Sequence, residues 1–172
     1  KATPEDVTAT GNVLLNDTDA EGGPLSVTQF TVAGDPTIYA PGSTVTFANV
    51  GALTLNADGS YSFVPVANYN GPVPVATYTL SDGHNAFDTG TLTISVTPVN
   101  DPPIAMDDTN SGTEDHTLFG MVLPNDSDID GGALSVASYA VNGDPVTYIA
   151  GQLAVIPSVG TFLMTSNGVY IF

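Results

Sequence analysis

The stretch Thr91-Leu92-Thr93-Ile94-Ser95-Val96-Thr97 alternates polar and apolar residues one by one. Side chains of a β-strand point alternately to opposite faces, so this period predicts a strand with one buried face. Further upstream, Leu53-Thr54-Leu55 and Tyr61-Ser62-Phe63 flank the turn-forming residues Asn56-Ala57-Asp58-Gly59, which predicts a hairpin. No stretch combines a helical period with helix caps. The sequence therefore predicts an all-β fold, in the form of a two-sheet β-sandwich with Greek-key connections.

The chain repeats itself with an offset of 125 − 16 = 109 residues, because Asn16–Val27 (NDTDAEGGPLSV) returns as Asn125–Val136 (NDSDIDGGALSV). The same offset aligns Gly34-Asp35-Pro36 with Gly143-Asp144-Pro145. The period is the size of one small β-sandwich domain. We therefore predict tandem sandwich repeats, with a complete repeat at 1–101 and a second repeat at 102–172 that lacks its C-terminal strands. The proline-rich stretch 97–103 joins them.

Charge and composition exclude several classes of function. The chain has 172 residues with 18 acids and a single cationic side chain, Lys1, which gives a net charge of −17. Without basic clusters we expect no nucleic-acid partner, and without a long apolar run we expect no direct membrane insertion. Cysteine is absent, which excludes disulfides and thiolate metal sites. Hydrophobic residues make up 42% of the chain, which is enough for a core.

Two acidic motifs carry the chemistry, Asp17-x-Asp19-x-Glu21-Gly22 and Asp126-x-Asp128-x-Asp130-Gly131. Alternating carboxylates followed by glycine are typical of the start of a calcium loop. An EF-hand is excluded, because Thr28 and Ala137 stand where its bidentate glutamate would be. Aspartate and glycine also form ordinary turns. Two copies in register, in a chain almost without cations, favour Ca²⁺.

Further ligands follow from where a sandwich places its loops. We expect two clusters of oxygen ligands, one at the junction between the repeats and one at the opposite end of the first repeat, where a preceding repeat would complete it. The junction cluster consists of Glu5, Asn100, Asp101, Asp126, Asp128 and Asp130. The opposite cluster consists of Asp17, Asp19, Glu21 and Asp82.

The residues resemble a known family. Val75–Gly83 and Leu92–Pro103 look like the last strands and the linker of a cadherin-type domain, and Asn125-Asp126-x-Asp128 stands in the place of its Asp-x-Asp motif. The repeat, including Asn56–Gly71, is most similar to the bacterial cadherin-like or Ig-like tandem repeats of giant RTX-type surface adhesins. The Asp-Arg-Glu motif of animal cadherins and the RTX nonapeptide are absent. The resemblance implies an extracellular or cell-surface location.

The sequence leaves three classes of function open. The first is a calcium-rigidified extender of a secreted or surface bacterial adhesin, whose partners are neighbouring repeats and whose host or surface ligand binds other parts of the parent. The second is a self-assembling extracellular fibre subunit completed by strand donation between chains. The third is a carbohydrate- or protein-binding module. We expect no enzyme, since His84 and His116 occupy non-equivalent positions and no acid pair suggests a catalytic cleft.

Overall fold

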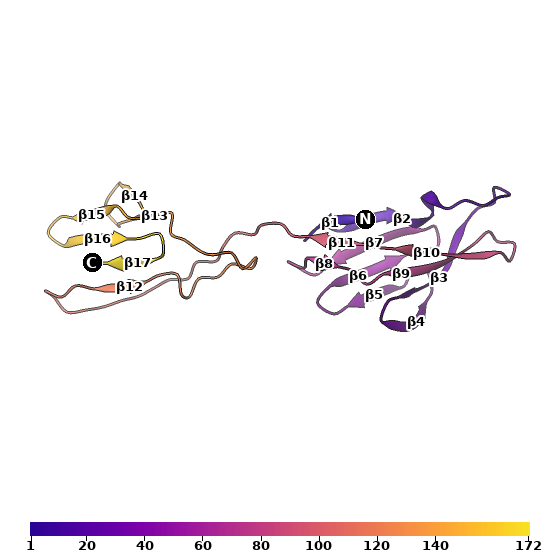
Figure 1. Cartoon of the computed structure of the whole chain (residues 1–172), viewed down its shortest axis with the longest axis horizontal. Helices are drawn as coiled ribbons and strands as arrows, with labels where there is room; N and C mark the ends of the chain where they lie inside the picture. The colour runs from indigo at the N-terminus through magenta and orange to yellow at the C-terminus, as the bar shows by residue number, and fades with distance from the viewer. The chain divides into compact units, whose positions relative to one another are not determined.

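The computed structural model describes all 172 residues, and the chain divides into two units, Lys1–Val99 (unit 1) and Asn100–Phe172 (unit 2) (Figure 1). Apart from one short 3-10 helix, η1 (Val13–Asn16), every regular element is a β-strand. The prediction of an all-β fold is therefore confirmed. No helix is long and apolar enough to cross a membrane.

Unit 1 is a sandwich of two four-stranded sheets with a small third sheet. The sheet orders are β2-β7-β6-β5, β10-β9-β3-β4 and β1-β11-β8. The chain changes sheets between β2 and β3, between β4 and β5 and again after β7, which gives the Greek-key connection that we predicted. The strands are β1 (Ala2–Pro4), β2 (Ala9–Asn12), β3 (Ser26–Val32), β4 (Asp35–Tyr39), β5 (Thr44–Phe47), β6 (Gly51–Leu55), β7 (Ser60–Pro65), β8 (Gly71–Pro72), β9 (Ala76–Ser81), β10 (Phe87–Leu92) and β11 (Ser95–Thr97).

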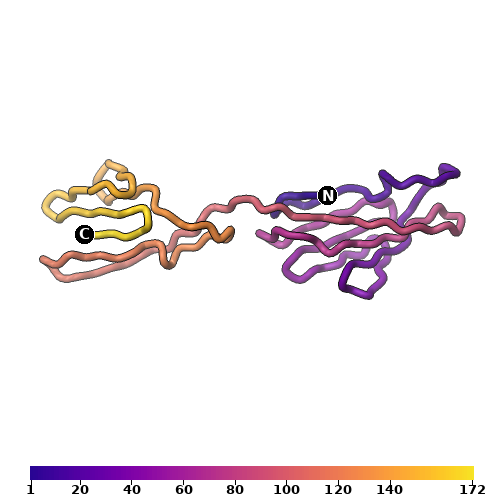
Figure 2. Tube along the Cα trace, viewed as in Figure 1, coloured from indigo at the N-terminus to yellow at the C-terminus, as the bar shows by residue number.

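The alternating stretch at 91–97 is half-buried as its period predicts. Leu92, Ile94 and Val96 are buried, and the residues between them are exposed. The stretch is not one strand, because it leaves β9 after Leu92 and resumes as β11, which runs parallel to β1 with Val96 opposite Thr3 (Figure 2). The first and last strands of unit 1 thus lie side by side, and β11 leads towards the end of the unit at Val99.

The predicted hairpin is also present. Strands β6 and β7 are antiparallel with Leu55 opposite Tyr61, and the N–H of Gly59 donates to the carbonyl of Asn56 at 3.0 Å. Gly59 has a φ of 79°, and a Cβ there would lie 2.5 Å from the side chain of Leu14. The turn therefore requires glycine for its backbone conformation and for space. Leu53, Leu55 and Phe63 of this hairpin are among the most buried side chains.

Unit 2 repeats the first part of unit 1. Its sheet β12-β17-β16-β15 has the order of β2-β7-β6-β5, and β13 pairs with β14 as β3 pairs with β4. Positive φ recurs at the 109-residue offset in seven pairs, of which Asp6 with Asp115 and Gly51 with Gly160 are examples. Unit 2 has no counterpart of β1 or of β8 to β11. Its strands are β12 (Phe119–Met121), β13 (Ser138–Ala140), β14 (Thr147–Ile149), β15 (Leu153–Ile156), β16 (Gly160–Met164) and β17 (Val169–Ile171).

Candidate metal-binding loops

The two acidic motifs fold into the same loop. In unit 1 the carboxylate of Asp19 accepts the N–H of Glu21 at 3.0 Å, and in unit 2 Asp128 accepts the N–H of Asp130 at 2.8 Å. The glycine after each motif has a φ of 76° in one copy and 73° in the other. These turns hold the middle acid of each motif in one orientation, because its side chain is bonded to the loop's own backbone.

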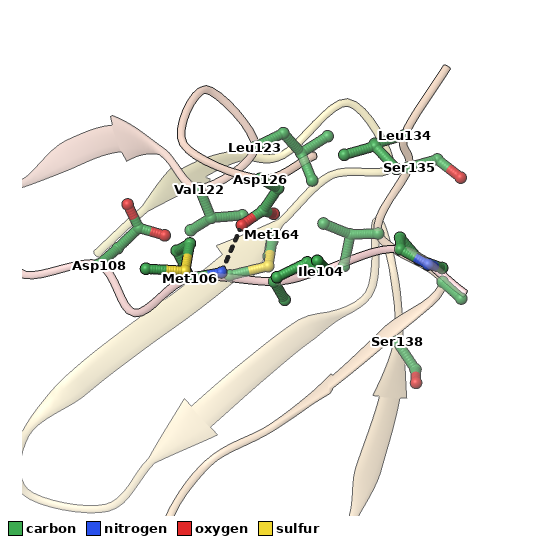
Figure 3. Close-up of a pocket in the computed structure, with 14 residues that line it drawn as sticks. Ile104, Met106, Asp108, Val122, Leu123, Asp126, Leu134, Ser135, Ser138 and Met164 are labelled. Atoms are coloured by element: carbon green, nitrogen blue, oxygen red, sulfur yellow. Dashed lines mark hydrogen bonds between the residues drawn. The ribbon is translucent and has the colours of Figure 1, made fainter. Parts of the chain in front are cut away.

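The first acid of each motif has a different partner in the two units. Asp17 accepts the hydroxyl of Tyr78 at 2.9 Å, and the same hydroxyl lies 3.3 Å from the carbonyl of Val13. Burial, then the hydrogen bond and the negative charge of Asp17, raise the pKa of Tyr78 to about 12. In unit 2, Asp126 accepts the backbone N–H of Met106 at 2.8 Å (Figure 3). Each first acid therefore ties its loop to a segment distant in sequence.

At the loop end of unit 1, three of the expected ligands come together. Asp19, Glu21 and Asp82 line one shallow pocket of about 200 Å³. The backbone N–H groups of His84 and Ala86 donate to Asp82 at 2.7 and 3.3 Å and lower the pKa of its carboxyl. Asp17 does not line this pocket, because its carboxylate is directed to Tyr78.

Asp88 lines the same pocket and was missed by the sequence analysis. Asp88 lies on β10, opposite Leu80 of β9, and the hairpin between these strands brings it near Asp82. The signal that would have revealed it is the spacing of Asp82 and Asp88 on either side of a predicted hairpin turn.

In unit 2 the acidic loop contacts the start of the unit. The N–H of Asp101 donates to the carboxylate of Asp130 at 2.7 Å, and Ile104 forms an isolated antiparallel bridge with Ser127. Asn100 donates its side-chain amide to the neighbouring carbonyl of Asp101 at 3.0 Å. The loop therefore lies against the segment that opens unit 2, as the topological argument expected for the residues Asp101 and Asp130.

Glu5 lies at the end of unit 1 that leads to unit 2. Its side chain is only 4% exposed and accepts the backbone N–H of Val99, the last residue of that unit. The N–H of Glu5 in turn donates to the carbonyl of Thr97 at 2.9 Å. Burial of a carboxylate costs free energy unless hydrogen-bond donors or a cation compensate its charge. The buried carboxylate of Glu5 is therefore a candidate ligand for a cation.

The chemistry of these side chains fits a hard cation such as Ca²⁺, because every donor in both clusters is a carboxylate or amide oxygen. The side chains are not gathered into a finished site. No group of three or more His, Cys, Asp or Glu side chains in the structure has the arrangement of a metal centre. Most of the acids instead accept hydrogen bonds from backbone N–H groups or from Tyr78.

The fold and the acidic loops define a class of tandem β-sandwich repeats with oxygen-rich ends. Residues 1–98 match the family model of the bacterial cadherin-like domain, and residues 100–172 match that of a bacterial Ig domain. The chain belongs to the bacterial cadherin-like family, and its second unit is an Ig-like repeat. No curated protein matches the chain. Domains of these families are typically structural modules that are extracellular or surface-exposed, and cadherin-like domains generally bind calcium.

Proposed function

We propose that this chain is an extender segment of a secreted or cell-surface bacterial adhesin, in which Ca²⁺ fixes the joint between consecutive repeats. Its partners are the neighbouring repeats, and adhesion to a host or other surface belongs to other parts of the parent. The chain performs no catalysis in this proposal. Its role is to keep the parts of the adhesin on either side of it at a fixed distance.

One observation carries the proposal: acidic oxygen ligands lie beside the last residue of unit 1 and beside the first residues of unit 2. On the side of unit 1, Glu5 is buried and bonded to Val99. On the side of unit 2, Asp101 is bonded to Asp130, in the loop that also holds Asp128. Ca²⁺ bound to these oxygens would neutralise the carboxylates of each unit. At the opposite end of unit 1, Asp19, Glu21 and Asp82 are the corresponding ligands, with Asp88 added.

The expected affinity suits an extracellular module. Such modules bind calcium with dissociation constants of about 10⁻⁴ to 10⁻³ M. Calcium at about 100 times its dissociation constant stabilises the bound form by about 2.7 kcal/mol per site. Binding of this strength is sufficient to fix a joint outside the cell.

The test is a calcium titration of the full chain followed by thermal melting and small-angle scattering. We expect calcium to raise the melting temperature and to narrow the distribution of distances within the chain, and chelator to reverse both effects. Asp128→Ala should reduce the response. Asp58→Ala is the matched control, because it removes the same charge from an exposed hairpin turn outside both acidic loops. Identical melting and scattering with calcium and with chelator would refute the proposal.

A further inference from the structure

The turn between β13 and β14 contains an asparagine followed by a glycine, Asn142-Gly143. Asparagine is chemically labile. When glycine follows it, the glycine nitrogen can attack the side-chain amide carbon, because no Cβ obstructs the approach. The chain has two other pairs of this kind, Asn70-Gly71 and Asn167-Gly168. The structure distinguishes the three pairs, because the attack requires a free carboxamide, a free N–H and a backbone that can move.

Both reacting groups are free at Asn142. Its side chain forms no hydrogen bond, and the N–H of Gly143 donates to no acceptor. Both residues are exposed, and a Cβ placed on Gly143 would have no atom within 4 Å. The five-membered ring that the attack forms therefore meets no neighbouring group.

The turn at Asn142 is also held by few bonds. The N–H of Asp144 donates to the carbonyl of Val141 at 3.0 Å and closes the turn. The carboxylate of Asp144 accepts the N–H of Val146 at 2.9 Å and the hydroxyl of Tyr148 at 2.7 Å, and these two bonds hold the chain after the turn. An exposed turn closed by one backbone bond opens locally at a low cost in free energy.

The other two pairs are restrained. The carboxamide oxygen of Asn167 accepts the hydroxyl of Thr165 at 2.5 Å, and the N–H of Gly168 donates to the carbonyl of Thr165 at 2.9 Å. In the third pair, Gly71 is the first residue of β8 and lies opposite Val96 of β11. Neither pair combines a free carboxamide with a glycine outside a hydrogen-bonded turn or strand.

Exposure of the turn is a property of the hairpin itself. The equivalent turn of unit 1 has Ala33 and Gly34, and φ is 87° for both Gly34 and Gly143. Ala33 and Gly34 are exposed although β8 to β11 are all present in unit 1. Alanine has no carboxamide, so the turn of unit 1 does not undergo the reaction.

We propose that Asn142 is a site of spontaneous deamidation. The nitrogen of Gly143 loses its proton to solvent and forms a bond to Cγ of Asn142. The bond from Cγ to the side-chain nitrogen breaks, and this nitrogen takes up a proton and leaves as ammonia. Water, the only other reactant, then opens the cyclic imide. Opening at Cγ gives aspartate, and opening at the main-chain carbonyl gives isoaspartate, whose backbone runs through Cβ.

The two products differ in their effect on unit 2. Both add a negative charge, but only isoaspartate lengthens the backbone of the turn. The bond from the N–H of Asp144 to the carbonyl of Val141 depends on the length of the turn. Isoaspartate therefore weakens this bond and loosens the pairing of Ser138–Ala140 with Thr147–Ile149. The chain thus contains a slow structural change that needs no enzyme.

The test is incubation of the full chain at mildly alkaline pH, with and without denaturant. A protease that cleaves at acidic residues and mass spectrometry then separate asparagine, aspartate and isoaspartate at each pair. In the folded chain we expect Asn142 to react about tenfold faster than Asn167, because the Asn167 pair must first break two hydrogen bonds, each worth about twofold to tenfold. In denaturant the pairs should react at similar rates.

Thr165→Val is the matched variant, because it removes the hydroxyl that binds the carboxamide of Asn167. It should accelerate the reaction at Asn167 and leave that at Asn142 unchanged. Asn142→Asp separates charge from lengthening: exchange of the amides of Thr147–Ile149 should be unchanged in this variant and faster in the isoaspartate fraction. Equal rates at Asn142 and Asn167 in the folded chain overturn the proposal, and so does reaction at Asn142 in denaturant alone.

Discussion

Tyr78 is the residue whose removal tests the energetics of unit 1 most directly. Its side chain is 3% exposed, and its hydroxyl donates to Asp17 at 2.9 Å. Tyr78→Phe keeps the ring and removes only this donor. A hydrogen bond to a charged group contributes about 1.5 to 3 kcal/mol. For a domain of about 100 residues each kcal/mol shifts the melting temperature by about 4 to 8 °C, so a loss of about 2 kcal/mol lowers it by about 8 to 16 °C.

The same substitution has a signature in pH. The folded pKa of Tyr78 is about 12 against an ordinary value of 10.0, so the unfolded chain releases this proton first. The stability contributed by the protonated hydroxyl is complete below pH 10 and is lost as the pH rises towards 12. We therefore expect the wild-type chain to lose stability over this interval, and Tyr78→Phe to lose less over the same interval.

The assay is thermal unfolding followed by near-ultraviolet circular dichroism from pH 7 to 12. Tyr61→Phe is the matched control, since the pKa of Tyr61 is raised by burial alone and the residue lies in the same core. We expect Tyr61→Phe to melt close to the wild-type chain at neutral pH. A melting temperature for Tyr78→Phe within about 2 °C of wild type would refute the reasoning, because the bond to Asp17 would then contribute no net stability.

Four further substitutions test other parts of the fold. Phe63→Ala should cost about 3 to 5 kcal/mol of unfolding free energy, because this ring is fully buried, whereas Phe172→Ala, at the equivalent but 39% exposed position, should cost much less. Gly51→Ala should destabilise unit 1 by more than about 2 kcal/mol, since φ is 155° and a Cβ would lie 2.4 Å from a backbone oxygen. Tyr148→Phe should raise the pKa of Asp144, because the Tyr148 hydroxyl is the main cause that lowers it.

Chemical denaturation measures the changes at Phe63, Phe172 and Gly51, and a carboxyl titration by NMR measures the effect of Tyr148→Phe. Equal losses for Phe63→Ala and Phe172→Ala would contradict the difference in burial between these two rings. A Gly51→Ala chain as stable as wild type would show that the backbone there can relax. The Asp144 carboxyl stabilises the fold above its ordinary pKa, and this contribution disappears as the pH falls through its lowered value. An unchanged pKa in Tyr148→Phe would exclude the proposed cause.

Much of the fold follows from short patterns in the sequence. Alternation at 91–97 and the turn at Asn56–Gly59 predict strands correctly, because side-chain direction and turn chemistry are local properties. The 109-residue repeat predicts the sheet order that the two units share, because similar sequences fold into similar strands. The division of 91–97 into β10 and β11 was not predicted. The division depends on the partner strands, because β10 pairs with β9 and β11 pairs with β1. The residue pattern of one strand does not say which strands it pairs with.

The candidate site was only partly accessible from sequence. The two acidic loops were predicted from their spacing, and the contact of Asp101 with Asp130 followed from topology. The pairing of Asp17 with Tyr78 and the position of Asp88 were not predicted. Both are contacts between strands whose register is set by packing over long sequence distances. The hydrogen bond from the backbone N–H of Met106 to Asp126 was also not predicted. Every residue except proline has such an N–H, so the residue type does not reveal the bond.

The parallel pairing of β1 with β11 determines how unit 1 carries mechanical load. A pull on Lys1 and Val99 acts at opposite ends of these two parallel strands, so it slides one along the other. Their connecting bonds, which include Ser95 N–H to the carbonyl of Lys1 and Glu5 N–H to that of Thr97, then bear the force together. Had the strands been antiparallel, the same pull would have opened the bonds one after another. Unit 1 is therefore connected so that tension along the chain meets several hydrogen bonds at once.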